Sequence, residues 1–118
     1  MNIKEAIMAF SQSEKIKAGL IWAAQALELF QGLSEEERRG SEKIITALLH
    51  MIGHEISLAR SLAPHEAWNA VEPPIQKALT MIQSGVGHEA VTHLSKSLSN
   101  VTNIGQQSMS LLKQERLL

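Results

Sequence analysis

Apolar side chains recur every three or four positions along almost the whole chain, which is the spacing of amphipathic α-helices. Val, Ile and Thr never gather into the short alternating runs that are typical of β-strands. The pattern therefore predicts an all-α protein. Because its connecting segments are short, and short links favour antiparallel neighbours, we expect an up-and-down four-helix bundle formed by a single domain over residues 1–118.

The first apolar segment divides in two by the phase of its large side chains. Asn2 followed by Glu5 has the pattern of a capping box, which predicts a short extra N-terminal helix ending at Phe10. At about 100° per residue, the large apolar side chains of this short helix lie on a different side from those of the segment that follows. We therefore expect a break at residues 11–13 and a second helix that ends at Gln31.

A second capping-box pattern, Ser34 with Glu37, predicts the next helical turn. Gly40 and Ser41 then have the pattern of a helix stop followed by a new N-cap. We expect this turn to end there and a fresh helix to occupy residues 41–62.

The third helix contains two adjacent prolines, Pro73 and Pro74. Neither can donate a hydrogen bond to the preceding turn, so the sequence predicts a break at this point. The segments expected in the second half of the chain are 64–71, 74–83 and, after a turn with two glycines, 88–115.

The helix that ends at Gln31 carries more apolar surface than one core needs. Opposite its core stripe lie Ala18, Trp22 and Leu29. A helix that is apolar all round is usually buried all round, which indicates an interface with a second copy in a homodimer or with a helical protein partner. Alternatively, the N-terminal helix folds back over this side and covers it with Ile3, Ile7 and Phe10.

Composition removes several kinds of chemistry. The chain has no cysteine, no aspartate and no tyrosine, which excludes disulfides, thiolate metal sites, cysteine nucleophiles, Ser-His-Asp triads and aspartyl phosphate acceptors. Glutamate would have to supply any carboxylate chemistry. Nothing in the sequence gives reason to expect a bound cofactor.

Charge and hydropathy indicate which classes of partner and which location to expect. Eleven basic and twelve acidic residues give a net charge of -1 without a basic face, so nucleic acid is not an expected partner. The longest apolar stretch, residues 18–30, is too short and too often interrupted to cross a bilayer, and the N-terminus lacks the pattern of a signal peptide. We expect a soluble protein of the cytoplasm that does not bind membranes.

The most reactive segment is the one that carries His50 and His54, four residues apart on the polar side of the helix over residues 41–62. Two imidazoles at this spacing suit zinc or nickel, but a metal site needs further ligands. The candidates lie at the start of the last helix, where His88, Glu89 and His93 follow one another within two turns. A metal-binding bundle is therefore an alternative function.

His54-Glu55-Ile56 resembles the start of the H-box of sensor histidine kinases, and an exposed histidine on the second helix of a bundle resembles a histidine phosphotransfer domain. The resemblance implies phosphoryl transfer through His54 or His50. It covers three residues. The H-box continues with a basic residue and a Thr/Ser-Pro step, whereas residues 57–59 are Ser-Leu-Ala, and the Lys-Gly pair of phosphotransfer domains is absent after His50.

Two further residues have expected roles in the bundle. Glu55 falls within the apolar arc of its helix, where it could act as a buried acid or pair with a base such as Arg60 or Lys77. Trp68 is expected to anchor the third helix in the core. The leading prediction is a small, non-catalytic helical bundle that binds a protein partner, with homodimerisation through Ala18, Trp22 and Leu29.

Overall fold

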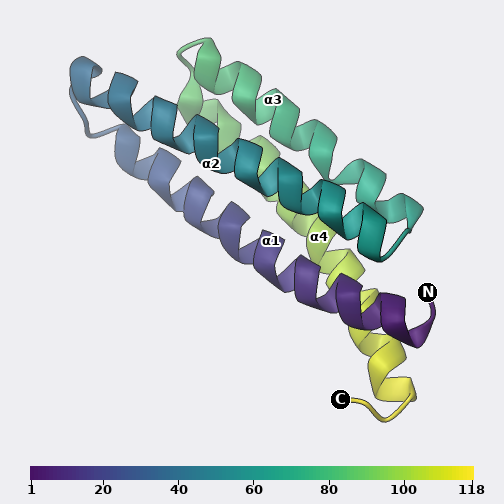
Figure 1. Ribbon diagram of the computed structural model, residues 1–118. Helices are drawn as coiled ribbons and strands as arrows, with labels where there is room; N and C mark the ends of the chain where they lie inside the picture. The colour runs from purple at the N-terminus through teal and green to yellow at the C-terminus, as the bar shows by residue number, and fades with distance from the viewer.

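The computed structural model describes residues 1–118, which form helices and no strands. The elements in chain order are α1 (Ile3–Phe30), α2 (Glu35–Leu62), the short 3-10 helix η1 (Glu66–Ala70), α3 (Glu72–Gln83) and α4 (Gly87–Gln114). Successive α-helices run antiparallel in a bundle that measures 52 × 21 × 18 Å (Figure 1). The predicted all-α four-helix bundle is confirmed.

Each helix of the bundle packs on two neighbours, in the cyclic order α1, α2, α3, α4 and back to α1. The contact between α1 and α4 is the most extensive, and that between α2 and α3 is the least. Because α3 has 12 residues and the other three helices have 28 each, the C-terminal part of α4 extends past α3 and packs on the N-terminal part of α1 (Figure 1).

The predicted break at residues 11–13 is wrong, because α1 is one continuous helix. Its core stripe simply passes from large to small side chains toward the N-terminus, where Ala6, Ala9 and Ser13 are buried while Ile3 and Ile7 remain exposed. The capping box at Asn2 is confirmed. Since α1 does not fold back, its N-terminal turns do not cover the side that carries Trp22.

Small residues set the distance between α1 and α4. Ser13 is buried against Gly105, and a side-chain carbon added at position 105 would lie only 2.7 Å from the Ser13 Oγ atom. The Ser13 hydroxyl donates to the carbonyl oxygen of Phe10 at 2.9 Å, so it is satisfied within its own helix. The two helices therefore approach closely without leaving a buried polar group unpaired.

The second predicted stop is also wrong, since α2 continues through Gly40 and Ser41. The Ser41 hydroxyl donates to the carbonyl oxygen of Glu37 at 3.0 Å, which is the behaviour of a mid-helix serine rather than of an N-cap. The helix begins at the Ser34 capping box, where hydrogen bonds from Ser34 lower the pKa of Glu37. The N-cap at Ser34 stabilises the helix by more than Gly40 destabilises it.

The two prolines lie in the first turn of α3 and not between two α-helical segments. A missing backbone N–H costs nothing there, because the first N–H groups of a helix have no partner within it. The segment expected at residues 64–71 is instead η1, in which Trp68 is fully buried and donates from Nε1 to the carbonyl oxygen of Ala63 at 3.1 Å. Trp68 thus anchors this end of the core, as predicted.

The packing of α1 on α4 yields a stability prediction. Gly105→Ala should lower the free energy of unfolding by about 1 kcal/mol, because the added carbon displaces the Ser13 hydroxyl. Adding Ser13→Ala to this variant should restore part of the loss. The matched control is Gly40→Ala, which meets no atom within 4 Å and should raise stability by up to about 1 kcal/mol. Urea unfolding of the wild type and the three variants measures their free energies of unfolding. Equal effects of the two glycine substitutions would contradict the proposed close contact.

Candidate interaction surface

The outer side of α1 exposes large apolar side chains. Trp22 is 65% exposed and Leu29 is 75% exposed, while Ala18, the third residue predicted for this surface, is half-buried. Trp22 and Leu29 therefore face away from the core, as their phase along the helix predicts.

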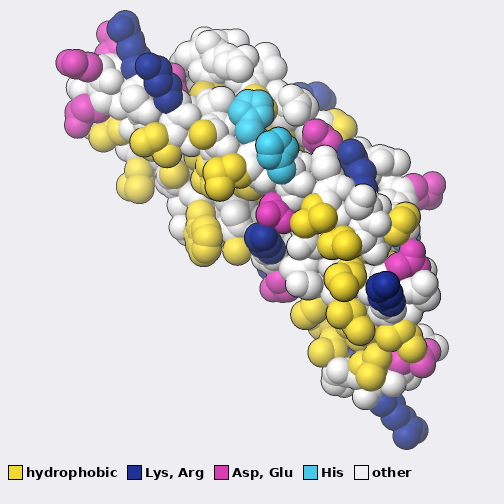
Figure 2. Space-filling model, in the orientation of Figure 1, with side chains coloured by type: hydrophobic (Ala, Val, Ile, Leu, Met, Phe, Trp, Pro, Cys, Tyr) yellow, Lys and Arg dark blue, Asp and Glu magenta, His cyan; other side chains and the backbone are white.

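The neighbouring helix α2 extends this apolar surface. Ile44 is 73% exposed and Met51 is 62% exposed, and Leu58 and Leu62 are exposed further along the same helix. We call the combined surface the apolar face, and it comprises the exposed Trp22, Leu29, Ile44, Met51, Leu58 and Leu62 together with Met8, which is half-buried and packs partly against the core. Figure 2 shows hydrophobic side chains gathered over α1 and α2 in two areas, with a basic and an acidic side chain between them.

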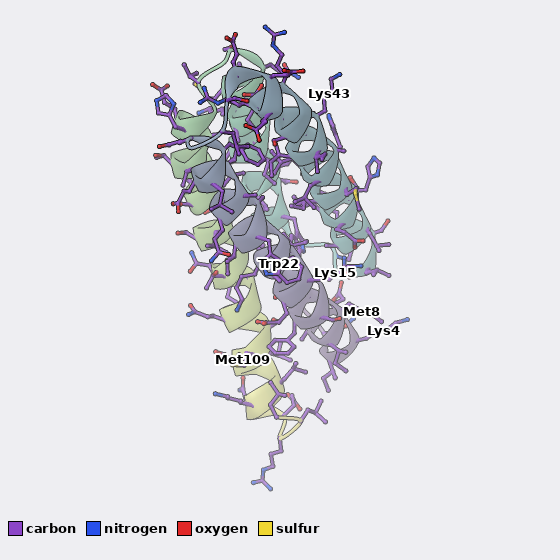
Figure 3. All side chains as sticks on the ribbon, turned by 90° about the vertical axis from the view of Figure 1, so that its left-hand side faces the viewer. Lys4, Met8, Lys15, Trp22, Lys43 and Met109 are labelled. Carbon is purple, nitrogen blue, oxygen red and sulfur yellow. The ribbon has the colours of Figure 1, made fainter.

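A seven-residue repeat aligns these side chains. Met8, Lys15, Trp22 and Leu29 follow one another at this spacing on α1, and Ile44, Met51 and Leu58 do so on α2. Seven residues make about two turns, so each series forms a line along one side of its helix. Figure 3 shows Met8, Lys15 and Trp22 in order along α1.

The apolar face includes a shallow hollow where α1 ends and α2 begins. It has a volume of about 170 Å³ and is lined almost entirely by apolar side chains, including Ala26, Phe30 and the exposed Ile44. A side chain from another molecule would find apolar contacts on both helices here.

An ion pair lies in the middle of the apolar face and joins its two helices. Lys15 Nζ lies 2.9 Å from Glu55 Oε1, and Gln12 Nε2 donates to the other carboxylate oxygen at 3.0 Å and to the Glu55 carbonyl oxygen at 3.2 Å. The hydrogen bond from Lys15, followed by that from Gln12, lowers the pKa of Glu55. Glu55 is thus an ionised, half-buried carboxylate and not the raised-pKa acid that its place in the apolar arc suggested.

The predicted partners of Glu55 were wrong. Arg60 pairs with Glu72 at the start of α3 at 3.1 Å, which holds α2 against α3. Lys77, the other candidate base, forms no ion pair. The base that reaches Glu55 lies 40 residues earlier in the chain, so only the register between α1 and α2 could have identified Lys15.

His50 and His54 are exposed on α2, on the side that turns toward α3. They border a hollow of about 190 Å³ between these helices, which Glu72 and Gln76 of α3 also line. The hollow is not part of the apolar face. Figure 2 shows histidine side chains next to the edge of that face.

The remaining candidate ligands lie elsewhere. His88 and Glu89 are exposed in the first turn of α4, and His93 is half-buried further along that helix. His88 lines a different hollow, of about 310 Å³, beside the end of α1. Nowhere do three or more histidine or glutamate side chains come close enough together to hold a metal ion, so the convergence on His50 and His54 that a metal site requires is not found.

The neighbouring residue Glu55 does not support phosphotransfer through His54. The chemistry suggested by the His54-Glu55 pair needs the carboxylate to orient the imidazole. The Glu55 carboxylate instead accepts hydrogen bonds from Lys15 and Gln12 on α1. It is therefore engaged on the opposite side of α2 from the hollow that His54 borders.

Comparison with known proteins gives no match to any family, to any curated protein or to any solved structure. None of the helices combines the length and the apolar character that crossing a bilayer requires.

The contribution of α2 to the apolar face was missed from the sequence. The sequence was interpreted as a single core stripe on this helix that Met51 and Leu58 widen, although at about 100° per residue they lie about 120° and 140° from its centre, almost as far as Trp22 lies from the stripe of α1. The seven-residue spacing of Ile44, Met51 and Leu58, which matches that on α1, is the signal that could have revealed a second apolar line.

The ion pair yields a pH prediction. Because the pKa of folded Glu55 lies below its ordinary value of 4.5, its charged form stabilises the fold fully above about pH 4.5, and this contribution is lost as the pH falls through the lowered pKa. Glu55→Gln should therefore be less stable than the wild type at neutral pH, and the difference should shrink in acid. Urea unfolding across a pH series measures this, and parallel stability curves for the two proteins would contradict it.

Proposed function

We propose that this protein is a small, non-catalytic interaction domain that self-associates as a homodimer through the apolar face of α1 and α2. The single observation that carries the proposal is the continuity of exposed Trp22, Leu29, Ile44 and Met51 across two adjacent helices. Scattered apolar side chains are normal on a protein surface, but a contiguous group of this kind is typical of a binding site.

Energetics support burial of this face by another molecule. Covering a large aliphatic side chain contributes roughly 1.5–3 kcal/mol relative to leaving it in water, and the face offers several such side chains on one side of the bundle. Trp22 fits the role of an anchor, since tryptophan dominates the binding energy of many interfaces. Both helices of the surface are long, and the Lys15–Glu55 ion pair joins them.

The proposed location is the cytoplasm. A chain without cysteine is suited to a reducing compartment because it forgoes disulfides altogether. Neither a nucleic acid nor a membrane enters the proposal, in which the partner is a protein surface with complementary apolar side chains.

Self-association is tested by sedimentation over a range of concentrations. The wild type should form dimers, and Trp22→Glu should raise the dissociation constant at least about 30-fold, because it removes the anchor and places a charge in the apolar contact. Leu117→Glu is the matched control, since Leu117 is 52% exposed but lies beyond the end of α4. The proposal would be wrong if the wild type remained monomeric at every concentration, or if the two substitutions changed the dissociation constant equally.

Tryptophan fluorescence gives an independent measurement of the same contact. Trp68 is fully buried, so its emission should not change with association, whereas Trp22 is exposed in the single chain. In the Trp68→Phe variant, Trp22 emission should therefore shift to shorter wavelength as the protein concentration rises through the dissociation constant. Emission that stays that of a solvated indole while dimers form would show that the dimer uses another surface.

A further inference from the structure

The charges within the apolar face define how two copies can meet. The face consists of a first patch near the loop between α1 and α2, made of Trp22, Leu29, Ile44 and Met51, and a second patch made of Met8, Leu58 and Leu62. Between them lies the ion pair of Lys15 on α1 and Glu55 on α2. The arrangement of two copies rests on the proposed function, because it presupposes the homodimer.

A two-fold dimer buries the same surface on both copies, and its axis lies in the plane where the two faces touch. If the axis runs across the helices at the level of the ion pair, α1 lies on the partner's α1, and Lys15 meets the partner's Lys15. If the axis runs along the helices between α1 and α2, each α1 lies on the partner's α2. In that second arrangement, Lys15 meets the partner's Glu55.

Electrostatics distinguishes the two arrangements. The axis across the helices brings two ammonium groups together and two carboxylates together, and like charges in contact oppose association. The axis along the helices forms two additional contacts between opposite charges. Apolar side chains face apolar side chains in both arrangements, since the axis along the helices places the first patch on the partner's first patch and the axis across them places it on the partner's second patch, so the charges alone distinguish the two.

Both charged groups have free capacity for such contacts. Lys15 is 62% exposed at its side chain and uses one of its three donors, on Glu55 Oε1. Each Glu55 oxygen accepts one side-chain hydrogen bond, from Lys15 or from Gln12, and a carboxylate oxygen can accept two. The pair can therefore add partners without breaking the hydrogen bonds that join α1 to α2.

We propose that the occupant of the apolar face is a second copy of this chain, related by a two-fold axis parallel to the helices, with Lys15 of each copy in contact with the partner's Glu55. The four charges form a ring at the centre of an otherwise apolar contact. This ring selects a chain with the same order of charges and sets the specificity of the interface.

The test is the double variant Lys15→Glu with Glu55→Lys, which reverses the ion pair while keeping opposite charges within each chain. This variant should still form homodimers, since every contact in the ring remains attractive, although Gln12 loses its carboxylate acceptor and the homodimer is weaker than that of the wild type. In a mixture with the wild type, heterodimers would place lysine against lysine and glutamate against glutamate. Native mass spectrometry of the mixture, with one protein isotopically labelled, should therefore show heterodimers depleted at least about five-fold below their statistical share.

A control variant reverses the ion pair formed by Glu14 and Lys17, which lie 3.0 Å apart on a different side of α1. Glu14→Lys with Lys17→Glu should mix statistically with the wild type. Circular dichroism of each variant verifies its fold. High salt should restore mixing of the Lys15 and Glu55 double variant, because it screens the exposed charges.

The remaining outcomes each decide a separate point. Enrichment of heterodimers between the wild type and the Lys15 and Glu55 double variant would overturn the inference in favour of the axis across the helices. Statistical mixing would show that the ring does not form, although the proposed homodimer would stand. Absence of any dimer in the wild type would overturn the proposed function itself, which is a different result from either of these.

Discussion

The close packing of α1 on α4 is the contact on which the rest of the structure depends. Buried small residues line it on both helices: Ala6, Ala9 and Ser13 on α1, and Gly105 and Ser108 on α4. Because these side chains are short, the backbones approach closely at Ser13 and Gly105. Helix α1 is continuous from Ile3 to Phe30, so no separate N-terminal helix folds back over its outer side, and Trp22 and Leu29 stay exposed.

The ion pair between Lys15 and Glu55 affects both the apolar face and the contact between α1 and α2. It interrupts the apolar line of α1 at the second of its four positions, where the seven-residue repeat would otherwise place another apolar side chain. Lys15 and Gln12 together satisfy the half-buried Glu55 carboxylate and link α1 to α2 in the observed register. Polar groups within an apolar interface cost stability but can select one register among several, which is the role they have in coiled coils.

The sequence predicted those parts of the fold that rest on local patterns. Both capping boxes, at Asn2 and Ser34, occur in the structure, and the last helix was placed within one residue at each end. Of the three predicted breaks, those at residues 11–13 and at Gly40 do not occur, and the prolines lie at the start of a helix. The two failures have different reasons. The first rested on the phase of large apolar residues and overlooked a core stripe built from Ala6, Ala9 and Ser13, whereas the second rested on the Gly40-Ser41 pattern of a stop and a cap, and the helix accommodates that glycine.

The candidate site was predictable only in part. Trp22 and Leu29 lie about 140° and 160° from the centre of the α1 core stripe, and phase identifies them. Met51 and Leu58 lie about 120° and 140° from the centre of the α2 stripe, so the same phase argument applied to α2 would have identified its contribution. The contact between Lys15 and Glu55 joins residues 40 positions apart and depends entirely on the register of two helices, which no local pattern encodes.

The placement of the apolar face also links association to the stability of the bundle. Helix α2 packs on α1 along one side and only sparsely on α3 along the other, and it is thus the least supported of the three long helices. In the proposed dimer the partner's α1 lies directly on this helix and buries Ile44 and Met51, which water surrounds in the single chain. A ligand that binds only the folded form stabilises it by mass action, and a second copy acts in the same way. The helix with the weakest support within one chain is therefore the one that dimerisation would support most.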